Sequence, residues 1–286
     1  MMYSKITTMK QLIKTILFAT LIVCSGMVSA QELKIISFNI RYNSWNNIDG
    51  ENGWPNRKEA VVRMIREERP AAIGLQEALI DQLMYLDSCL PEYRRVGVGR
   101  DDGEEAGEFM AIYYNTDVVE LVSDETRWLS ATPETPSKGW DAACYRTVTK
   151  ARFKIKESDK EFIYLNTHLD HVGKTARTES AKFIASLAKE DESGSPIILG
   201  DDMNSTIDDE IFQSFYAEGL KAARELVPKK HTDNRITYNA YGKEKGSVID
   251  HFFVRSAKVK SFRTLDGDYG VPYISDHYPI EIVVEY

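Results

Sequence analysis

Cysteine is scarce in this 286-residue sequence, and its scarcity excludes a disulfide-rich scaffold. The chain has only three cysteines, of which Cys89 and Cys144 lie beyond the first thirty residues. Two cysteines permit one disulfide at most. We expect both to be small buried apolar residues, with a single disulfide as the alternative.

Clusters of basic residues are also lacking, which argues against a dedicated binder of duplex DNA. The chain carries 36 Lys and Arg against 44 Asp and Glu, a formal net charge of −8. No basic run with interleaved aromatic residues occurs, although phosphate backbones attract such clusters. A nucleic-acid substrate therefore stays possible but is not favoured, because one local basic groove would escape this test.

Repeats, low-complexity segments and Pro/Gly-rich linkers are missing from residues 31–286, so we predict a single domain there. The sequence also lacks a P-loop, a GxGxxG fingerprint and a serine-hydrolase signature. With 43% hydrophobic and 28% charged residues, the composition is that of an ordinary globular protein.

The first thirty residues have the pattern of a secretory signal peptide. Three lysines precede the apolar run TILFATLIVCSGMV, and Val28–Ala30 is a small-residue cleavage site. We expect cleavage after Ala30 and export to the periplasm or the exterior. The apolar run is short for a bilayer span, so no transmembrane segment is expected in the mature chain. Lipid attachment at Cys24 is a less favoured alternative, because no small residue stands directly before it.

Removing residues 1–30 leaves 33 basic against 44 acidic residues, a net charge of −11. In the remainder, apolar runs of strand length alternate with stretches of helical periodicity. Helices are predicted from Pro55 to Pro70, around Leu79–Leu86 and around Ala181–Ala188. Strands are predicted at 33–38, 71–75, 109–114, 118–122, 147–155, 161–166, 196–200, 247–254 and 279–286. Many of these strands are apolar on both faces, which indicates an α/β fold with layers of helices covering sheets.

Polar residues with metal-binding or proton-transfer chemistry follow one predicted strand after another. A single Asp or Asn at a strand end usually marks a turn, but six such endings are harder to explain that way. In α/β folds, functional side chains gather at strand ends. The endings are Asn39, Gln76-Glu77, Thr167-His168, Asp201 to Asn204, Asp250 and Ser275 to His277.

Histidine usage narrows the chemistry further. Three of the five histidines directly follow an aspartate, and a nearby carboxylate raises the pKa of a histidine and orients its ring. Neighbours within a strand point to opposite faces, so we expect Asp250 and His251 to lie in different environments. We interpret His231 and His251 as structural or surface residues and leave His171 open. The run from His168 to His171 does not complete a zinc ligand set, whereas oxygen ligands favour Mg²⁺ or Mn²⁺.

Six segments in family order resemble the endonuclease/exonuclease/phosphatase superfamily, whose fold is that of deoxyribonuclease I. They are SFNIRY (37–42), GLQEAL (74–79), NTHLDH (166–171), GDDMNS (200–205), SVIDHFFV (247–254) and SDHYPI (275–280). The resemblance spans about residues 33–286. It implies a four-layered α/β sandwich, in which two packed mixed sheets are flanked by helices and the site lies at one edge.

The resemblance also implies roles for particular residues. Implied metal ligands are Glu77, Asn39 and Asp276. Implied catalytic residues are Asp202 as the base for water, Asn204, His168 and His277 around the phosphoryl group, and Asp250 as the partner of His277. Implied substrate-binding residues are Arg57, Arg146, Asp170 and His171, although a surface salt bridge is an equal alternative for each arginine.

One residue departs from the family pattern. Many relatives have glycine directly before the Asp-x-Asn motif, where this chain has Asp201. Its carboxylate would either perturb Asp202 by like-charge repulsion or turn into solvent.

The sequence therefore predicts a secreted, monomeric, Mg²⁺-dependent phosphoesterase that hydrolyses a phosphodiester or a phosphomonoester. The expected substrates are phosphorylated small molecules, lipid head groups or nucleotides. A nuclease with the same site is the alternative, and a catalytically silent binding module is a remote one.

Overall fold

The computed structural model describes residues 32–191 and 193–286. The expected signal peptide and Cys24 lie outside the described residues. Within the described part of the chain, no helix is long and apolar enough to cross a bilayer.

The first of two six-stranded sheets has the strand order β11-β12-β1-β2-β4-β3. Its β1 and β2 are parallel, and the other pairings are antiparallel. The crossover from β1 to β2 runs through the helix α2, as a parallel pair requires. The strands are β1 (Glu32–Asn39), β2 (Ala72–Ala78), β3 (Tyr93–Val96), β4 (Phe109–Asn115), β11 (Lys258–Thr264) and β12 (Ile280–Glu285).

The second sheet has the order β5-β6-β7-β8-β10-β9 and repeats this plan. Its parallel pair is β7 and β8, joined through the helix α4. The strands are β5 (Val119–Trp128), β6 (Thr147–Ile155), β7 (Glu161–His168), β8 (Ile197–Asp202), β9 (Lys221–Ala222) and β10 (Asp250–Arg255).

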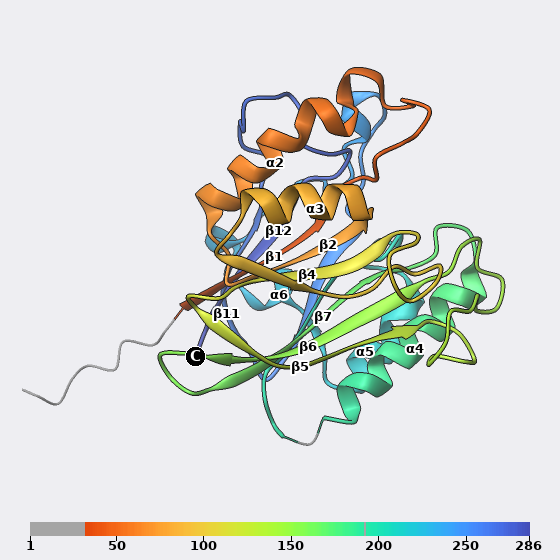
Figure 1. Cartoon of the computed structure of the whole chain (residues 1–286). Helices are drawn as coiled ribbons and strands as arrows, with labels where there is room; N and C mark the ends of the chain where they lie inside the picture. The colour runs from red at the N-terminus through yellow and green to blue at the C-terminus, as the bar shows by residue number, and fades with distance from the viewer. Residues whose placement is uncertain (1–31, 192) are drawn as a thin grey trace, which may run out of the picture. The chain divides into compact units, whose positions relative to one another are not determined.

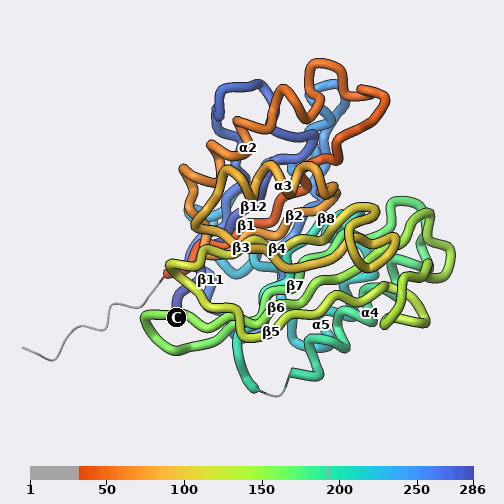
Figure 2. The backbone as a smooth tube through the Cα atoms, viewed as in Figure 1, coloured from red at the N-terminus to blue at the C-terminus, as the bar shows by residue number. Residues whose placement is uncertain are grey.

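The two sheets pack face to face and helices cover both outer faces, which makes four layers (Figure 1). The backbone trace shows α2 and α3 on the first sheet, and α4 and α5 on the second (Figure 2). The predicted α/β sandwich of two mixed sheets flanked by helices is confirmed. The helices are α2 (Trp54–Glu68), α3 (Ile80–Cys89), α4 (Lys174–Lys189), α5 (Gln213–Ala217) and α6 (Ala223–Leu226), with short 3-10 turns η1 (Gly50–Asn52), η2 (Glu210–Phe212), η3 (Lys229–His231) and η4 (Ala240–Gly242).

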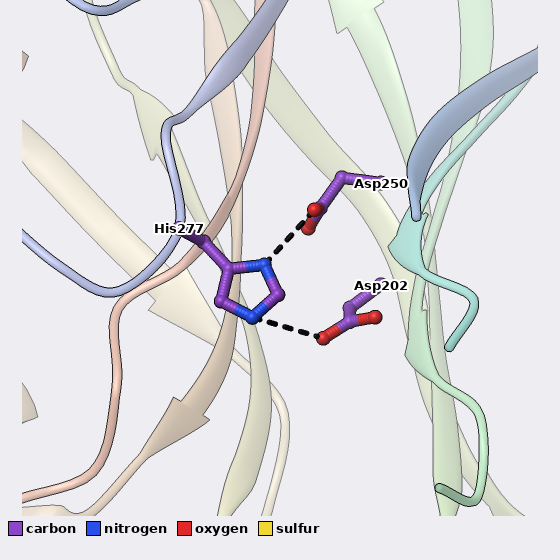
Figure 3. Close-up of side chains that lie close together, drawn as sticks. All are labelled: Asp202, Asp250 and His277. Carbon is purple, nitrogen blue, oxygen red and sulfur yellow. Dashed lines mark hydrogen bonds and ion pairs between the residues drawn. The ribbon is translucent and has the colours of Figure 1, made fainter. Parts of the chain in front are cut away.

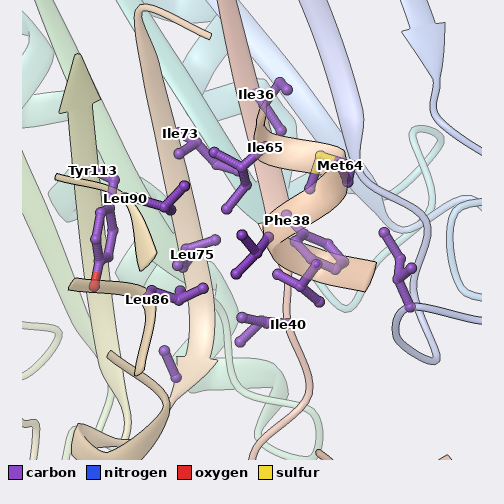
Figure 4. Packing of buried hydrophobic residues seen from close by; sticks show 14 of the residues in the cluster. Ile36, Phe38, Ile40, Met64, Ile65, Ile73, Leu75, Leu86, Leu90 and Tyr113 are labelled. Atoms are coloured by element: carbon purple, nitrogen blue, oxygen red, sulfur yellow. The ribbon is translucent and has the colours of Figure 1, made fainter. Parts of the chain in front are cut away.

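Helix α2 shows how the sequence builds the outer layer. Pro55 occupies its first turn, where a missing N–H costs nothing, and Arg69 ends it in a left-handed conformation before Pro70. The buried face of α2 packs on β1 and β2, where Met64 and Ile65 meet Phe38 (Figure 4). At about 25 cal/mol per Å² of apolar surface, such packing supplies most of the stability of the layer.

A buried polar network joins the two sheets beneath their parallel strands. The hydroxyl of Tyr164 on β7 donates to the carbonyl of Ile36 on β1 at 2.7 Å and accepts from the N–H of Gly74 on β2 at 3.2 Å. A Cβ at Gly74 would lie 2.6 Å from this hydroxyl, so only glycine leaves it room. Gln76 on β2 donates to Asn166 on β7 at 2.6 Å. These bonds set the relative position of the two sheets, and therefore of the residues at the strand ends.

Several features differ from the expectations. The edge strands β3 and β11 and the short helices α5 and α6 were not predicted, because short and half-exposed segments carry little periodic signal. Strand β5 extends to Trp128, well past the predicted end at 122. Cys89 and Cys144 are free thiols and only half-buried, so neither the expected burial nor the alternative disulfide occurs.

Candidate active site

Three of the predicted catalytic residues form one row across the second sheet. In the strand register, Asp202 at the end of β8 lies opposite His168 at the end of β7 and opposite Asp250 at the start of β10. Side chains opposite one another in neighbouring strands share a face of the sheet. All three are buried, so local pairing alone brings residues from distant parts of the sequence together.

His277 completes the row from the other sheet, since it lies in the loop before β12 (Figure 3). Its Nδ1 is 2.9 Å from Asp250 Oδ2 and its Nε2 is 3.6 Å from Asp202 Oδ2. Burial alone would lower the pKa of His277, but Asp250 and then Asp202 raise it to about 10. His277 is therefore an imidazolium at neutral pH, held between two carboxylates.

Asp202 is the centre of the cluster. Its Oδ1 accepts the backbone N–H of Asn204 at 2.9 Å, and its Oδ2 accepts the amide of Asn39 at 3.0 Å. Burial raises the pKa of Asp202 to about 7, although the charge of His277 opposes the shift. A carboxylate whose pKa lies near neutrality is suited to general-base work at neutral pH.

His168 presents a neutral imidazole on the other side of Asp202. Burial, together with the positive charges of Arg146 and Arg100, holds the pKa of His168 well below its usual value. Its Nε2 lies 2.9 Å from the side-chain amide nitrogen of Asn204 and 3.4 Å from Asp202 Oδ2. The two imidazoles beside Asp202 thus differ in charge, because His277 also bonds to Asp250, whereas burial and two nearby arginines disfavour a charge on His168.

A second group of carboxylates consists of Glu77, near the end of β2, and Asp276, in the loop before β12. A bulge near the end of β2 and a left-handed backbone at Glu77 (φ 62°) change the direction of this side chain. Arg41 lies between the two acids, with nitrogen–oxygen distances of 3.8 Å to each. Burial raises the pKa of Asp276, and the charge of Glu77 adds to that shift. The left-handed backbone of Glu77, a non-glycine residue, costs of order 1 kcal/mol, and such strain is typical of functional sites.

The amide nitrogen of Asn39 bridges the two groups of acids, donating to Glu77 Oε1 at 3.0 Å and to Asp202 Oδ2 at 3.0 Å. Its oxygen accepts the backbone N–H of Arg41 at 3.0 Å. In this arrangement Asn39 positions the two carboxylates, and its implied contact with a metal ion stays a prediction.

Two sets of residues are candidates for a metal site. Glu77 and Asp276 offer hard carboxylate oxygens of the kind that Mg²⁺ and Mn²⁺ prefer. The side-chain atoms of Asp202, Asp250 and His277 also lie within 4.8 Å of one another, but the imidazolium form of His277 has no lone pair for a metal ion. The carboxylates of Glu77 and Asp276 therefore fit a hard divalent cation.

The predicted substrate-binding residues separate into two kinds. Arg57 is only 1% exposed and donates to the backbone carbonyls of Asn52, Ile40, Ile274 and Arg41. Arg57 therefore connects the surrounding loops by hydrogen bonds, and it is not among the residues that line the site cavity.

Asp170 is buried as well, and it accepts backbone N–H groups from Ala143, Val172 and Gly173. Burial would raise the pKa of Asp170, but these donors and Arg146 hold it well below its usual value. Asp170 also accepts Arg146 Nε at 3.2 Å, and a second nitrogen of Arg146 lies 3.0 Å from His171 Nδ1. Arg146 and His171 line the site cavity, with Asp170 holding the arginine in place.

Asp201 neither turns into solvent nor joins the site. It is fully buried, and its register partners Thr167 and His251 lie on the face of the second sheet that α4 and α5 cover. Neither carboxylate oxygen has a hydrogen-bond partner among the described residues. Burial, with Asp202 and Asp250 nearby, raises the pKa of Asp201 well above its usual value. The solvated alternative is therefore wrong.

His251 is structural, as expected, and lies in a different environment from Asp250. Its Nε2 is 3.0 Å from the carbonyl oxygen of Ser205, and its ring packs edge-on against Phe212. A second cavity, of about 720 Å³, lies beside His251 and Arg224, and none of the predicted catalytic side chains lines it.

The site cavity of about 610 Å³ includes residues to which sequence reasoning assigned no role. Arg41 stands within the quoted motif SFNIRY, but nothing in that motif indicates that it lies between two acids. Arg100 and Glu108 had no signal at all, because they reach the site from the loop between β3 and β4. The additional lining residues are Arg41, Tyr42, Arg100, Glu108, Cys144, Tyr238, Ser247 and Ile249.

The fold and site together define a class of hydrolase. Phosphate-ester hydrolysis requires carboxylates that can hold a hard cation, and a general base such as a buried Asp whose pKa lies near neutrality. It also requires imidazole and amide groups around that base. A model of the endonuclease/exonuclease/phosphatase family matches residues 36–277, and the chain belongs to this family of phosphate-ester hydrolases.

Similar proteins agree with this assignment. An endonuclease/exonuclease/phosphatase protein of Bacteroides vulgatus is 33% identical, with a TM-score of 0.83 over 89% of this chain and 99% of that one. A mannosyl-6-phosphatase of Bacteroides thetaiotaomicron is also 33% identical, with a TM-score of 0.83 over 89% of this chain and all of that one (100%). An uncharacterised mimivirus protein, L388, is 25% identical over 88% of this chain and 100% of its own length.

Proposed function

We propose that this protein is a divalent-metal-dependent phosphoesterase that hydrolyses a phosphomonoester or a phosphodiester by attack of water. The observation that carries the proposal is the position of Asp202, a buried carboxylate with neutral His168 on one side and protonated His277 on the other. Similarity to a mannosyl-6-phosphatase supports phosphate-ester chemistry.

In this proposal Asp202 accepts the proton of the attacking water. Asn39 and the backbone N–H of Asn204 hold both carboxylate oxygens, so the base is fixed before substrate arrives. The imidazolium of His277 stabilises negative charge that develops on the phosphoryl oxygens, and Asp250 keeps it protonated. On the opposite side of Asp202, the amide nitrogen of Asn204 lies 2.9 Å from His168 Nε2 and donates to the carbonyl of Leu169 at 3.0 Å, so it holds the neutral imidazole in place.

Glu77 and Asp276 would hold the cation. When bound there, Mg²⁺ or Mn²⁺ neutralises phosphate charge and orients the ester for in-line attack. Arg41 lies 3.8 Å from both carboxylates and lines the same cavity, so a bound cation would share these acids with its guanidinium. Arg146, held by Asp170, supplies a positive charge from the far wall of the cavity.

The test compares neighbouring carboxylates on opposite faces of β8. Hydrolysis of p-nitrophenyl phosphate and bis-p-nitrophenyl phosphate is measured with Mg²⁺, and again with EDTA. Asp202→Asn should lower kcat by at least about 100-fold, as loss of a general base does, while the matched control Asp201→Asn stays active. Equal activity in the two variants, or full activity in EDTA, would overturn the proposal. Faster cleavage of an oligonucleotide than of either ester would identify a nuclease.

We also propose that the protein is exported after cleavage near Ala30 and acts as a monomer. The basic and apolar pattern of residues 1–30 supports export, and the absence of a linker in residues 31–286 supports one catalytic domain. Cell fractionation with N-terminal sequencing of the mature chain, and light scattering of the purified protein, test the two statements.

A further inference from the structure

An arginine–glutamate pair forms one wall of the site cavity. Arg100 and Glu108 face each other across the base of the loop between β3 and β4, and both line the cavity that contains His168 and Asp202. Their side chains form two parallel hydrogen bonds, with nitrogen–oxygen distances of 2.7 and 2.8 Å. Such bidentate pairs have a defined geometry, so the polar atoms of this wall are fixed.

The backbone around the pair is also held in place. The N–H of Arg100 donates to the carbonyl of Glu108 at 3.2 Å, and Gly99 bridges to Phe109 beside them. The indole of Trp128, at the end of β5, donates to the carbonyl of Arg100 at 2.7 Å. The second sheet therefore anchors the loop, and the pair is ready to contact a ligand without rearrangement.

Each arginine of this wall is paired with a carboxylate, although burial raises the pKa of Glu108 to about 7. Glu108 compensates Arg100, and Asp170 compensates Arg146 at 3.2 Å. A second phosphate group would have to compete with these two carboxylates for the arginines.

Neutral hydroxyl groups suit the pair better. The two bonded guanidinium nitrogens each carry one more hydrogen, and each carboxylate oxygen has another lone pair. A hydroxyl both donates and accepts, so neighbouring hydroxyls can satisfy both partners at once. The side chains are 11% and 17% exposed, and both line the site cavity.

We propose that Arg100 and Glu108 form a subsite for a polyhydroxylated leaving group, so that the substrate is a phosphate ester of a sugar or similar polyol. The inference rests on the proposed phosphoesterase function and specifies its substrate class. It assigns a specificity role to two residues that lie outside the catalytic cluster.

The experiment compares two leaving groups that differ in hydroxyls. The kcat/KM values for glucose 6-phosphate and mannose 6-phosphate are each divided by the value for p-nitrophenyl phosphate, which has no hydroxyl on its leaving group. Glu108→Gln should lower the higher of the two ratios by about tenfold or more, because a charged hydrogen-bond acceptor is lost. Arg100→Lys should lower it as well, since lysine cannot reproduce the bidentate geometry.

A matched control removes an arginine–glutamate pair outside the cavity. Arg127 on β5 donates to Glu125 at 2.8 Å, and Arg127→Lys should leave the ratio unchanged. Thermal unfolding of every variant shows whether it is folded, and Arg100→Lys serves if Glu108→Gln is not.

The outcomes separate the two levels of the proposal. A wild-type enzyme that hydrolyses p-nitrophenyl phosphate but neither hexose 6-phosphate would overturn the subsite alone. So would variants that lower activity on all substrates equally, because the pair would then only support the loop. Absence of any hydrolysis by the wild-type protein with Mg²⁺ would instead overturn the proposed function, and the subsite with it.

Discussion

Replacing Asp201 by asparagine should stabilise the protein, although the residue is fully buried and adjoins a proposed catalytic residue. Both of its carboxylate oxygens lack a hydrogen-bond partner among the described residues. A buried polar group without a partner costs about 1–3 kcal/mol, and more when it is charged. Asparagine leaves an unpartnered polar group of nearly the same shape, but it does not ionise, so we expect the free energy of unfolding to rise by about 1–3 kcal/mol at pH 8.

The gain should depend on pH in a defined direction. Because burial raises the pKa of Asp201 in the folded state, the folded protein binds a proton that the unfolded chain has already released. The stability of the wild-type protein therefore falls as the pH rises from the unfolded value near 3.9 towards the folded value, by up to about 1.4 kcal/mol per pH unit. The variant lacks this contribution, so its advantage should be larger at pH 8 than at pH 5.

Urea denaturation of the wild-type protein and the variant at pH 5 and pH 8 measures how their difference in stability changes with pH. The contributions of other titrating groups cancel because both proteins contain them. Asp208→Asn, at an exposed carboxylate in the same region, is the control and should shift stability by less than about 0.5 kcal/mol. A variant that is less stable than the wild-type protein at both pH values would refute the reasoning, because Asp201 would then have a stabilising partner.

Three further predictions concern other parts of the molecule. Burial lowers the pKa of His251 to about 4, so stability is fully present above the unfolded pKa near 6.5 and is lost by up to about 3 kcal/mol as the pH falls towards 4. His251→Gln should flatten this acid limb in denaturation curves, and an unchanged limb would contradict the assignment. Arg57→Met should lower the free energy of unfolding by about 2–4 kcal/mol, because four backbone carbonyls lose their donor, and a neutral result by urea titration would show that water replaces it. Mg²⁺ should raise the Tm, with a stabilisation of about 1.4 kcal/mol at ten times its Kd, and Glu77→Gln should abolish the rise; a Tm shift that survives in Glu77→Gln would place the ion elsewhere.

The functional residues at the strand ends could be predicted because polar residues abruptly interrupt the apolar runs of the parallel strands. Asp202 and Asn204 follow Ile197–Leu199, and His168 follows the run ending at Leu165. The alternation of strands and helices also indicated layered sheets, and the motif resemblance specified the four-layered sandwich that the structure has. These features depend on local periodicity, which a single sequence records.

The residues that form the cavity wall could not be predicted from the sequence in the same way. Arg100 and Glu108 belong to a polar loop whose sequence resembles any solvated turn, and tertiary contacts such as the hydrogen bond from Trp128 to Arg100 hold that loop at the site. The motif around Arg57 predicted a contact with substrate, yet helix α2 directs this side chain towards the backbone carbonyls of neighbouring loops. Helical periodicity indicates which face is buried, but it does not indicate whether a buried arginine meets substrate or backbone carbonyls.

The sequence by itself determined which residues carry the chemistry of this protein, because carboxylates, amides and imidazoles at strand ends are a property of the chain. Only the tertiary structure decided their partners and charges. His277 is protonated because Asp250 approaches it from the other sheet, whereas its neighbour in the sequence, Asp276, lies with Glu77 and Arg41. Asp201 and Asp202 are adjacent, yet strand geometry directs one into a helix-covered layer and the other into the site. A pKa depends on distances of a few ångströms and on exclusion of water, and both arise only when the two sheets pack together.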